Sequence, residues 1–262
     1  MNFKILTVVL LVCIPHLNLM QDKKSINQTD KQGRKQGHWI KQYQNGNIMY
    51  DGFFKDDYPT GEFKRYYENT VLKSVLVFSD NSKEAKATLY YHNGFKASEG
   101  KYINQLKDGK WQFFSSVTEG LVISEEEYSN NRKQGLSVKY YPDSTVAEKL
   151  YYSSDIKNGE WLKYHPNGSL HFKTTYLNDR LNGSFEAYFD NGKPEVTGQY
   201  KNNMKDGIWI IYKVDGSIKF KTEYSSGIPK SRNIDIYETD YIDSLENIKV
   251  KIADPEKTGE KW

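Results

Sequence analysis

The sequence is poor in several residue types on which common folds and sites depend. Its 262 residues contain one cysteine, which excludes a disulfide framework and a zinc site built from several cysteines. Aliphatic residues are few and the mean hydropathy is −0.80, too polar for an ordinary aliphatic core. Lysine and arginine number 37 against 34 aspartates and glutamates, without a block of like charge. The sequence therefore gives weak grounds for nucleic-acid binding.

Aromatic residues are, by contrast, abundant. The chain has 21 tyrosines, 12 phenylalanines and 5 tryptophans, which make up 15% of its residues. Disordered chains are poor in these residues, so most of this chain is expected to fold. The stretch from Gly37 to Lys230 contains 34 of the 38 rings and 17 of the 19 glycines. The unusual composition therefore belongs to one region.

The longest apolar run lies near the start of the sequence. Ten largely apolar residues, Ile5 to Ile14, follow Lys4 and end at Pro15. This run is shorter than the roughly 20 residues that cross a bilayer. A charged start, a short apolar stretch and a polar continuation are typical of a secretory signal peptide. We therefore predict a cleaved signal peptide over residues 1–20 and an exported protein, periplasmic, cell-surface or secreted, with a retained anchor as the alternative.

An internal repeat organises the aromatic region. A phrase of the type G-x-W-x-x-Y, followed by an N-G pair, recurs every 24 residues, with a single interval of 26. The two extra residues fall in Ser115–Gly120, within a turn. The eight units start at Gly37, Gly61, Ala85, Gly109, Gly135, Gly159, Gly183 and Gly207. We number positions in each unit from this first residue, position 0, and leave the two extra residues uncounted.

Three positions of the unit carry rings. Position 17 is Phe or Tyr in every unit, and positions 2 and 5 are aromatic in most. The candidate binding-surface or structural aromatics are Trp39, Trp111, Trp161 and Trp209 at position 2 and Tyr164, Tyr188 and Tyr212 at position 5. Ala87 and Ser137 are the degenerate members at position 2. Positions 2 and 5 differ in parity, so either both sheet faces carry rings or a bulge intervenes.

The turn chemistry indicates β-hairpins. Pairs such as Asn45-Gly46 in mid-unit and Asn158-Gly159 between units are typical of type I′ turns, because Asn and Gly tolerate positive φ. We therefore predict an all-β fold: a single elongated antiparallel β-meander solenoid, an open curved sheet of about eight 24-residue hairpin repeats and about sixteen strands over residues 37–230. Residues 21–36 are expected to form a polar lead-in. Residues 231–262, with alternating segments at 234–237 and 248–252, are expected to form a tail or capping strand.

The pattern G-x-W-x-x-Y…N-G…G-x-Y resembles the variant form of the MORN (membrane occupation and recognition nexus) repeat. The clearest units are Gly159–Tyr176, Gly183–Tyr200 and Gly207–Tyr224. The resemblance implies an open curved antiparallel sheet and a binding or scaffolding role. Some bacterial proteins of this repeat class are labelled antitoxins, which implies a bound partner and no reaction.

The sequence shows no phosphate-binding, dinucleotide-binding or nucleophile-elbow motif. His165 occupies a slot that is Tyr or Phe in other units, and Glu125–Glu127 are most simply a solvated face or edge. We therefore predict a non-enzymatic protein with no catalytic residues, no cofactor and no metal. The expected partner is another protein. The alternatives are a partner toxin, neutralised in an antitoxin-like role, and a cell-surface glycan; a nucleic acid and a membrane surface are disfavoured.

Overall fold

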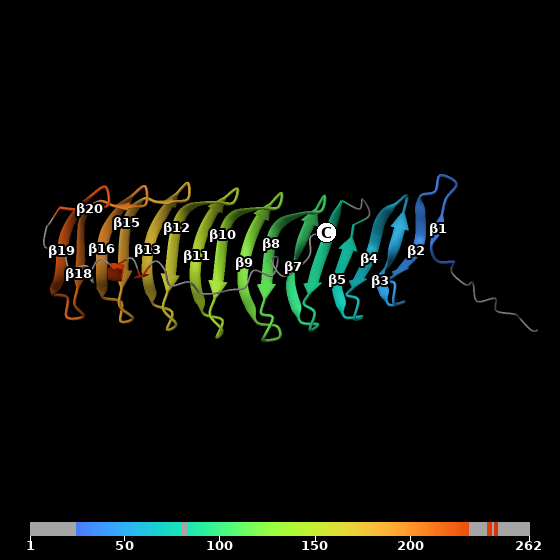
Figure 1. Ribbon diagram of the computed structural model, residues 1–262, viewed down its shortest axis with the longest axis horizontal. Helices are drawn as coiled ribbons and strands as arrows, with labels where there is room; N and C mark the ends of the chain where they lie inside the picture. The colour runs from blue at the N-terminus through green and yellow to red at the C-terminus, as the bar shows by residue number, and fades with distance from the viewer. Residues whose placement is uncertain (1–24, 80–82, 231–239, 243, 246–262) are drawn as a thin grey trace, which may run out of the picture.

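The computed structural model describes residues 25–79, 83–230, 240–242 and 244–245. Within them the chain forms one open antiparallel sheet of 20 strands that follow one another as a meander, with β14 and β15 both paired to β13 and β17 and β18 both paired to β16 (Figure 1). The hairpins lie side by side along the long axis of the molecule. The predicted fold class is therefore confirmed. The predicted signal peptide and the alternating segments 234–237 and 248–252 lie outside the described residues.

The strand count differs from the predicted sixteen for two reasons. The first strands of units 7 and 8 are each broken in two, and a short strand pairs at either end of the array. The strands are β1 (Gln28–Thr29), β2 (Lys35–Gln42), β3 (Ile48–Lys55), β4 (Tyr58–Tyr66), β5 (Leu72–Phe78), β6 (Glu84–Tyr90), β7 (Lys96–Ile103), β8 (Leu106–Phe114), β9 (Val122–Ser129), β10 (Arg132–Tyr140), β11 (Val146–Ser153), β12 (Ile156–Tyr164), β13 (Leu170–Leu177), β14 (Arg180–Leu181), β15 (Gly183–Tyr188), β16 (Pro194–Lys201), β17 (Met204–Lys205), β18 (Gly207–Tyr212), β19 (Ile218–Ser225) and β20 (Ile228–Pro229).

The mid-unit turns are hairpin turns, as predicted, but their predicted type I′ geometry is wrong. In the first unit only Gly46 of the Asn45-Gly46 pair has positive φ, 87°. The amide of Tyr43 donates to the carbonyl of Asn47 at 2.9 Å, which closes a three-residue loop with glycine in the left-handed region. The Asn45 side chain accepts the amide of Asn47, so asparagine contributes as a side-chain cap.

The type I′ turns lie between the units, at other residues than predicted. Both central residues have positive φ at the pairs Asp56-Asp57, Asn104-Gln105, Asn130-Asn131, Ser154-Asp155, Asn178-Asp179, Asn202-Asn203 and Ser226-Gly227. Successive turns are joined, because the amide of Lys133 donates to the Asp155 side chain at 2.7 Å and the amide of Asp155 donates to the Lys133 carbonyl at 3.0 Å. This contact recurs along the array and holds consecutive units in register.

The predicted junction pairs, such as Asn158-Gly159, form bulges inside strands. Trp161 pairs with Leu150 and Lys157 with Tyr152, so residues 158–160 face a single residue of β11. Gly159 lies in this bulge with a φ of 125°. A bulge bends its strand, and the strands in Figure 1 curve along their length. The bend brings side chains from the two ends of a hairpin together over one face.

The described part of the C-terminal tail is helical. Residues 240–242 and 244–245 form helical turns that lie in front of the last units in Figure 1. The expectation of a tail or capping strand over 231–262 stays a prediction, because its two alternating segments lie outside the described residues. β20 covers one end of the edge of β19, since Tyr224 pairs with Pro229 and Ser225 with Ile228.

Candidate binding surfaces

The two faces of the sheet carry different sets of rings. Positions 2, 4, 13, 15 and 17 point to one side, which we name the core face, and positions 1, 3, 5, 14 and 16 point to the other, the tyrosine face. The bulge near each mid-unit turn lies in the returning strand, where Lys163 pairs with Phe172 and Tyr164 with Leu170. Both faces therefore carry rings, and the ring positions 2 and 5 keep their opposite sides.

The tryptophans lie on the core face, and their environment is structural. Trp111 and Trp209 are fully buried, Trp161 is 7% exposed and Trp39 is half-buried. Trp111 stacks edge-on against Tyr102 with ring centroids 4.9 Å apart, and Trp209 meets Tyr200 in the same way. Trp111, Trp161 and Trp209 are therefore part of the packed core of the array, whereas Trp39 in the first unit is only half-buried.

The residue opposite position 2 on the preceding strand is glycine in several units where position 2 is a large ring. Trp111 covers Gly100, where a Cβ would lie 2.3 Å from the indole. Phe63 on Gly52 and Trp209 on Gly198 repeat this arrangement. The degenerate members at position 2 show the reverse: Ala87 faces Leu76 and Ser137 faces Glu126. In these units a large residue at one of the two positions faces a smaller one at the other, whereas in unit 6 Trp161 faces Leu150.

Lysines two residues before the leading position cover the rings. Lys107 is only 4% exposed, and its Nζ lies 4.8 to 5.0 Å from the rings of Trp111, Phe113 and Tyr128. Such a contact is a cation–π interaction, which is stronger when water is excluded. Lys35, Lys133, Lys157 and Lys205 take equivalent places over rings of their own units. Sequence reasoning missed this lysine row, although its 24-residue spacing is visible in the sequence.

The tyrosines at position 5 lie on the tyrosine face and are half-buried. The Tyr188 hydroxyl donates to the Glu186 carboxylate at 2.5 Å, and burial together with this bond raises the pKa of Tyr188. Tyr164 lies beneath Lys149, whose Nζ is 5.8 Å from the ring centroid, and Tyr212 is 3.5 Å from the Thr197 hydroxyl. The three predicted tyrosines therefore form a row on one face, one per unit, and each is half-buried.

Position 6 forms a hydrogen-bonded ladder along the mid-unit turns. The hydroxyls of Tyr43, Tyr67, Tyr91 and Tyr141 each donate to the carbonyl of position 5 in the next unit, at 2.7 to 2.9 Å. His165 takes the same place, with Nε2 2.9 Å from the Tyr188 carbonyl. The interpretation of His165 as a repeat-position aromatic is therefore confirmed.

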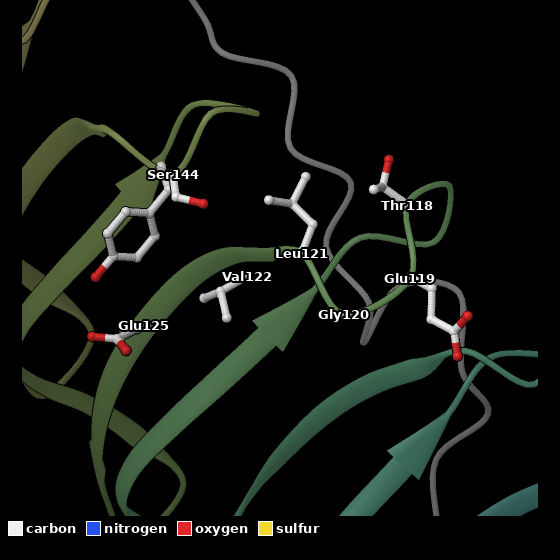
Figure 2. A pocket seen from close by; sticks show the side chains of 8 residues that line it. Thr118, Glu119, Gly120, Leu121, Val122, Glu125 and Ser144 are labelled. Carbon is white, nitrogen blue, oxygen red and sulfur yellow. The ribbon is translucent and has the colours of Figure 1, made fainter.

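The inserted residues of unit 4 open a hollow on the tyrosine face (Figure 2). Leu121, Val122, Glu125, Tyr140 and Ser144 line this open space of about 480 Å³. The ladder is interrupted here, because Ser115 stands where six other units have a ring. The hollow is thus a local departure from the repeat.

Glu125 is the charged group of this hollow. It accepts bonds from Lys110 Nζ at 2.8 Å and Gln112 Nε2 at 2.7 Å, and from the Tyr140 hydroxyl. Burial raises the pKa of Glu125, but these bonds outweigh burial, so the pKa lies below its usual range. Glu126 lies buried on the core face and accepts from Lys133 at 2.7 Å. The interpretation of this acidic run as a solvated face or edge is therefore wrong for Glu126, which is buried, whereas Glu125 is half-buried at the open hollow.

Among the described residues, no group of three or more His, Cys, Asp or Glu side chains is close enough to hold a metal ion. In the same part of the chain, no helix has the length and apolar character to cross a membrane.

The rings of His165 and His171 lie 4.4 Å apart. Burial, helped by the charges of His165 and Lys163, lowers the pKa of His171 to about 4.

These features define a β-hairpin solenoid in which each unit packs on its neighbours. Residues 35–56, 157–178 and 181–202 match the family model described as MORN repeat variant. The chain therefore carries MORN-variant repeats, and the resemblance predicted from the sequence is confirmed. No curated protein matches the chain.

Proposed function

We propose that this chain is a non-enzymatic protein-binding module that engages its partner through the tyrosine face. One observation carries the proposal: Tyr164, Tyr188 and Tyr212 form a row of half-buried rings on the face opposite the two hydrophobic core clusters. Tyrosine is enriched at protein interfaces, because its ring offers a large contact area and its hydroxyl a hydrogen bond.

The rest of the array supports this role. The core face is closed by stacked rings and lysines, and the turns are joined from unit to unit. Such an array holds the tyrosine face in a fixed shape before binding. A preformed surface loses little conformational entropy on association, which favours affinity.

The test uses the full chain as bait against extracytoplasmic fractions of its source. A variant with Tyr164→Ser, Tyr188→Ser and Tyr212→Ser is compared with Tyr58→Ser, which removes a tyrosine that is 66% exposed at a type I′ turn. A partner retained by the wild type and by Tyr58→Ser but lost by the triple variant supports the proposal. Equal retention by all three, or no partner at micromolar sensitivity, contradicts it.

Export is part of the proposal and is supported by the apolar run at Ile5–Ile14 that follows Lys4. N-terminal sequencing of the protein isolated from its source tests it directly. We expect a new N-terminus close to residue 21 and enrichment outside the cytoplasm. An intact N-terminus on protein found in the cytoplasm would overturn this part alone.

A glycan is the second candidate ligand, and the hollow at Tyr140 favours it. A half-buried ring beside Glu125, Gln112 and Lys110 combines a stacking surface with hydrogen-bonding groups. A glycan array should then retain the wild type and lose Tyr140→Ala, with Tyr66→Ala as the matched control at position 5 of another unit. Absence of any retained glycan removes this candidate.

A further inference from the structure

A stripe of apolar side chains runs along the tyrosine face, next to the mid-unit turns. Each tyrosine at position 5 lies opposite a residue without a polar side chain at position 11 of the same hairpin. In units 6, 7 and 8 these pairs are Tyr164 with Leu170, Tyr188 with Pro194 and Tyr212 with Ile218. Pro194 and Ile218 are exposed, and the other four residues are half-buried. We name this row the tyrosine stripe.

The tyrosine stripe has a fixed period. The hairpins lie side by side along the long axis of the molecule (Figure 1), so successive tyrosines are two strands apart. Two strands correspond to about 9.6 Å at 4.8 Å per strand. Tyr140, paired with Val146 in unit 5, extends the stripe by one more ring. A ligand that contacts every ring in the same way must therefore repeat at this distance.

The period is close to that of a polyproline II helix. Three residues of this helix advance by about 9.3 Å and return to the same face. An α-helix returns to nearly the same face after seven residues, or about 10.5 Å. Over the three intervals from Tyr140 to Tyr212, the α-helix is out of step by about 2.7 Å and the polyproline II helix by about 0.9 Å. A β-strand repeats a face every two residues, about 6.7 Å, and does not match the rings.

The polar groups of the tyrosine stripe are donors. The Tyr164 hydroxyl makes no hydrogen bond, and the Lys149 ammonium group no ion pair, with any other residue that the structure describes. The two lie together, with Lys149 Nζ 5.8 Å from the centroid of the Tyr164 ring. The carboxylates beside the stripe, Glu125 and Glu186, already accept from lysine and tyrosine side chains of the same face. The stripe thus offers donors without a free carboxylate.

A proline-rich segment has the complementary chemistry. Proline has no N–H to donate, and the carbonyls of a polyproline II helix make no internal hydrogen bonds. Such a segment therefore accepts hydrogen bonds and donates few, whereas the hydroxyls of a glycan do both. Its rings pack against aromatic side chains, which is how other Pro-rich ligands are bound.

We propose that the tyrosine stripe binds a proline-rich segment of a protein partner in the polyproline II conformation. Every third residue of the segment lies against a tyrosine ring, and its carbonyls accept from Tyr164 and Lys149. About ten residues span the four rings from Tyr140 to Tyr212. This inference rests on the proposed function and names the chemistry of the partner at that face.

The test uses fluorescently labelled oligoproline peptides of four, seven and ten residues and the full chain. Each addition of three residues reaches one more ring, so we expect the dissociation constant from fluorescence anisotropy to fall about threefold or more at each step. Affinities that do not change with peptide length overturn the proposal, as does no binding of the ten-residue peptide at about millimolar concentration.

Two substitutions at one position separate the ring from its hydroxyl. Tyr164→Ala should weaken binding of the ten-residue peptide about tenfold, and Tyr164→Phe, which removes only the donor, about threefold. Tyr58→Ser, at a tyrosine that is 66% exposed and outside the stripe, is the control and should bind as the wild type does. Wild-type affinity of Tyr164→Ala overturns the proposal. Should that variant lose its thermal transition, Tyr164→Phe decides, and wild-type affinity of it overturns the proposal.

A helical peptide tests the competing occupant. An alanine-rich helix of about 20 residues with leucine at every seventh position covers the same length of the stripe. Tighter binding of this peptide than of the ten-residue oligoproline overturns the proposal. A partner that is lost by the triple tyrosine variant, without any binding of oligoproline, would leave the proposed function standing and refute only this inference.

Discussion

The indole of Trp111 lies flat against Gly100 on the neighbouring strand, and its Nε1 donates to the Lys101 carbonyl at 3.1 Å. Because a Cβ at residue 100 would meet the ring at 2.3 Å, the substitution Gly100→Ala must displace the indole. We expect it to lower the free energy of unfolding by about 2–3 kcal/mol, as overpacking of a core does. Urea unfolding followed by tryptophan fluorescence measures the loss.

A rescue variant tests the mechanism of that loss. The pair Leu76 and Ala87 fills the equivalent space in the reverse order. Gly100→Leu combined with Trp111→Ala copies this pair, and we expect it to be more stable than Gly100→Leu alone. If the second substitution brings no recovery, the two residues do not share one packing volume.

The hairpin repeat was predictable from the sequence, and the turn types were not. Asn45-Gly46 signals a hairpin whichever turn it forms, because glycine suits every left-handed position. At Asn158-Gly159 the same pair of residue types forms a bulge. The turn between the units lies at Ser154-Asp155, which contains no glycine, so no such pair marks it in the sequence. Asn, Asp and Ser adopt positive φ at these turns, where pairing on both sides fixes the backbone.

The faces of the sheet were predictable in part. The parity of positions 2 and 5 left open whether both faces of the sheet carry rings or a bulge intervenes between the two positions. The strand pairing shows that both faces carry rings. The burial of Trp209 follows from Gly198 opposite, a cross-strand relation that depends on the register. The seating of Ile242 on the core face depends on a contact between distant parts of the chain, which no local pattern reports.

The tryptophans at position 2 should differ in their sensitivity to substitution. Trp209 Nε1 donates to the Gln199 carbonyl at 3.2 Å, whereas Trp161 Nε1 is buried without a hydrogen-bond partner. Trp161 faces Leu150 where Trp209 faces Gly198, so its indole does not reach the neighbouring backbone. We expect Trp209→Phe to cost about 1 kcal/mol more than Trp161→Phe. Equal losses in chemical unfolding would contradict this account.

The stability of the array should depend on pH through His171. Its folded pKa of about 4 lies below the ordinary histidine value of 6.5, so the unfolded chain binds a proton that the folded chain excludes. Stability should therefore fall as the pH decreases through 6.5 and level off below about 4. We expect a loss on the order of 1–2 kcal/mol, reduced from the full shift because the ring is partly solvated.

His171→Gln isolates this effect. Thermal unfolding of wild type and variant is compared between pH 7.5 and pH 4.5, and the carboxylates that titrate at the lower end of this range contribute equally to both proteins, so their effect cancels in the difference. The wild type should lose stability relative to the variant across this range, and the difference should be constant above about pH 7.5. A difference that does not change with pH would show that His171 is not the titrating group.

Lys107 should stabilise the core face through its charge as well as its aliphatic stem. Its Nζ lies within 5.0 Å of three ring centroids, and unit 7 has Leu181 at the same position. Lys107→Ala removes both contributions, and we expect it to cost about 2–3 kcal/mol. Lys107→Leu keeps an apolar cover and copies unit 7, so its cost should be smaller. Lys107→Glu places a carboxylate against the negative ring faces and should be the most destabilising. Urea unfolding of the three variants gives this order, and a stability of Lys107→Glu close to that of Lys107→Leu would exclude a contribution of the charge.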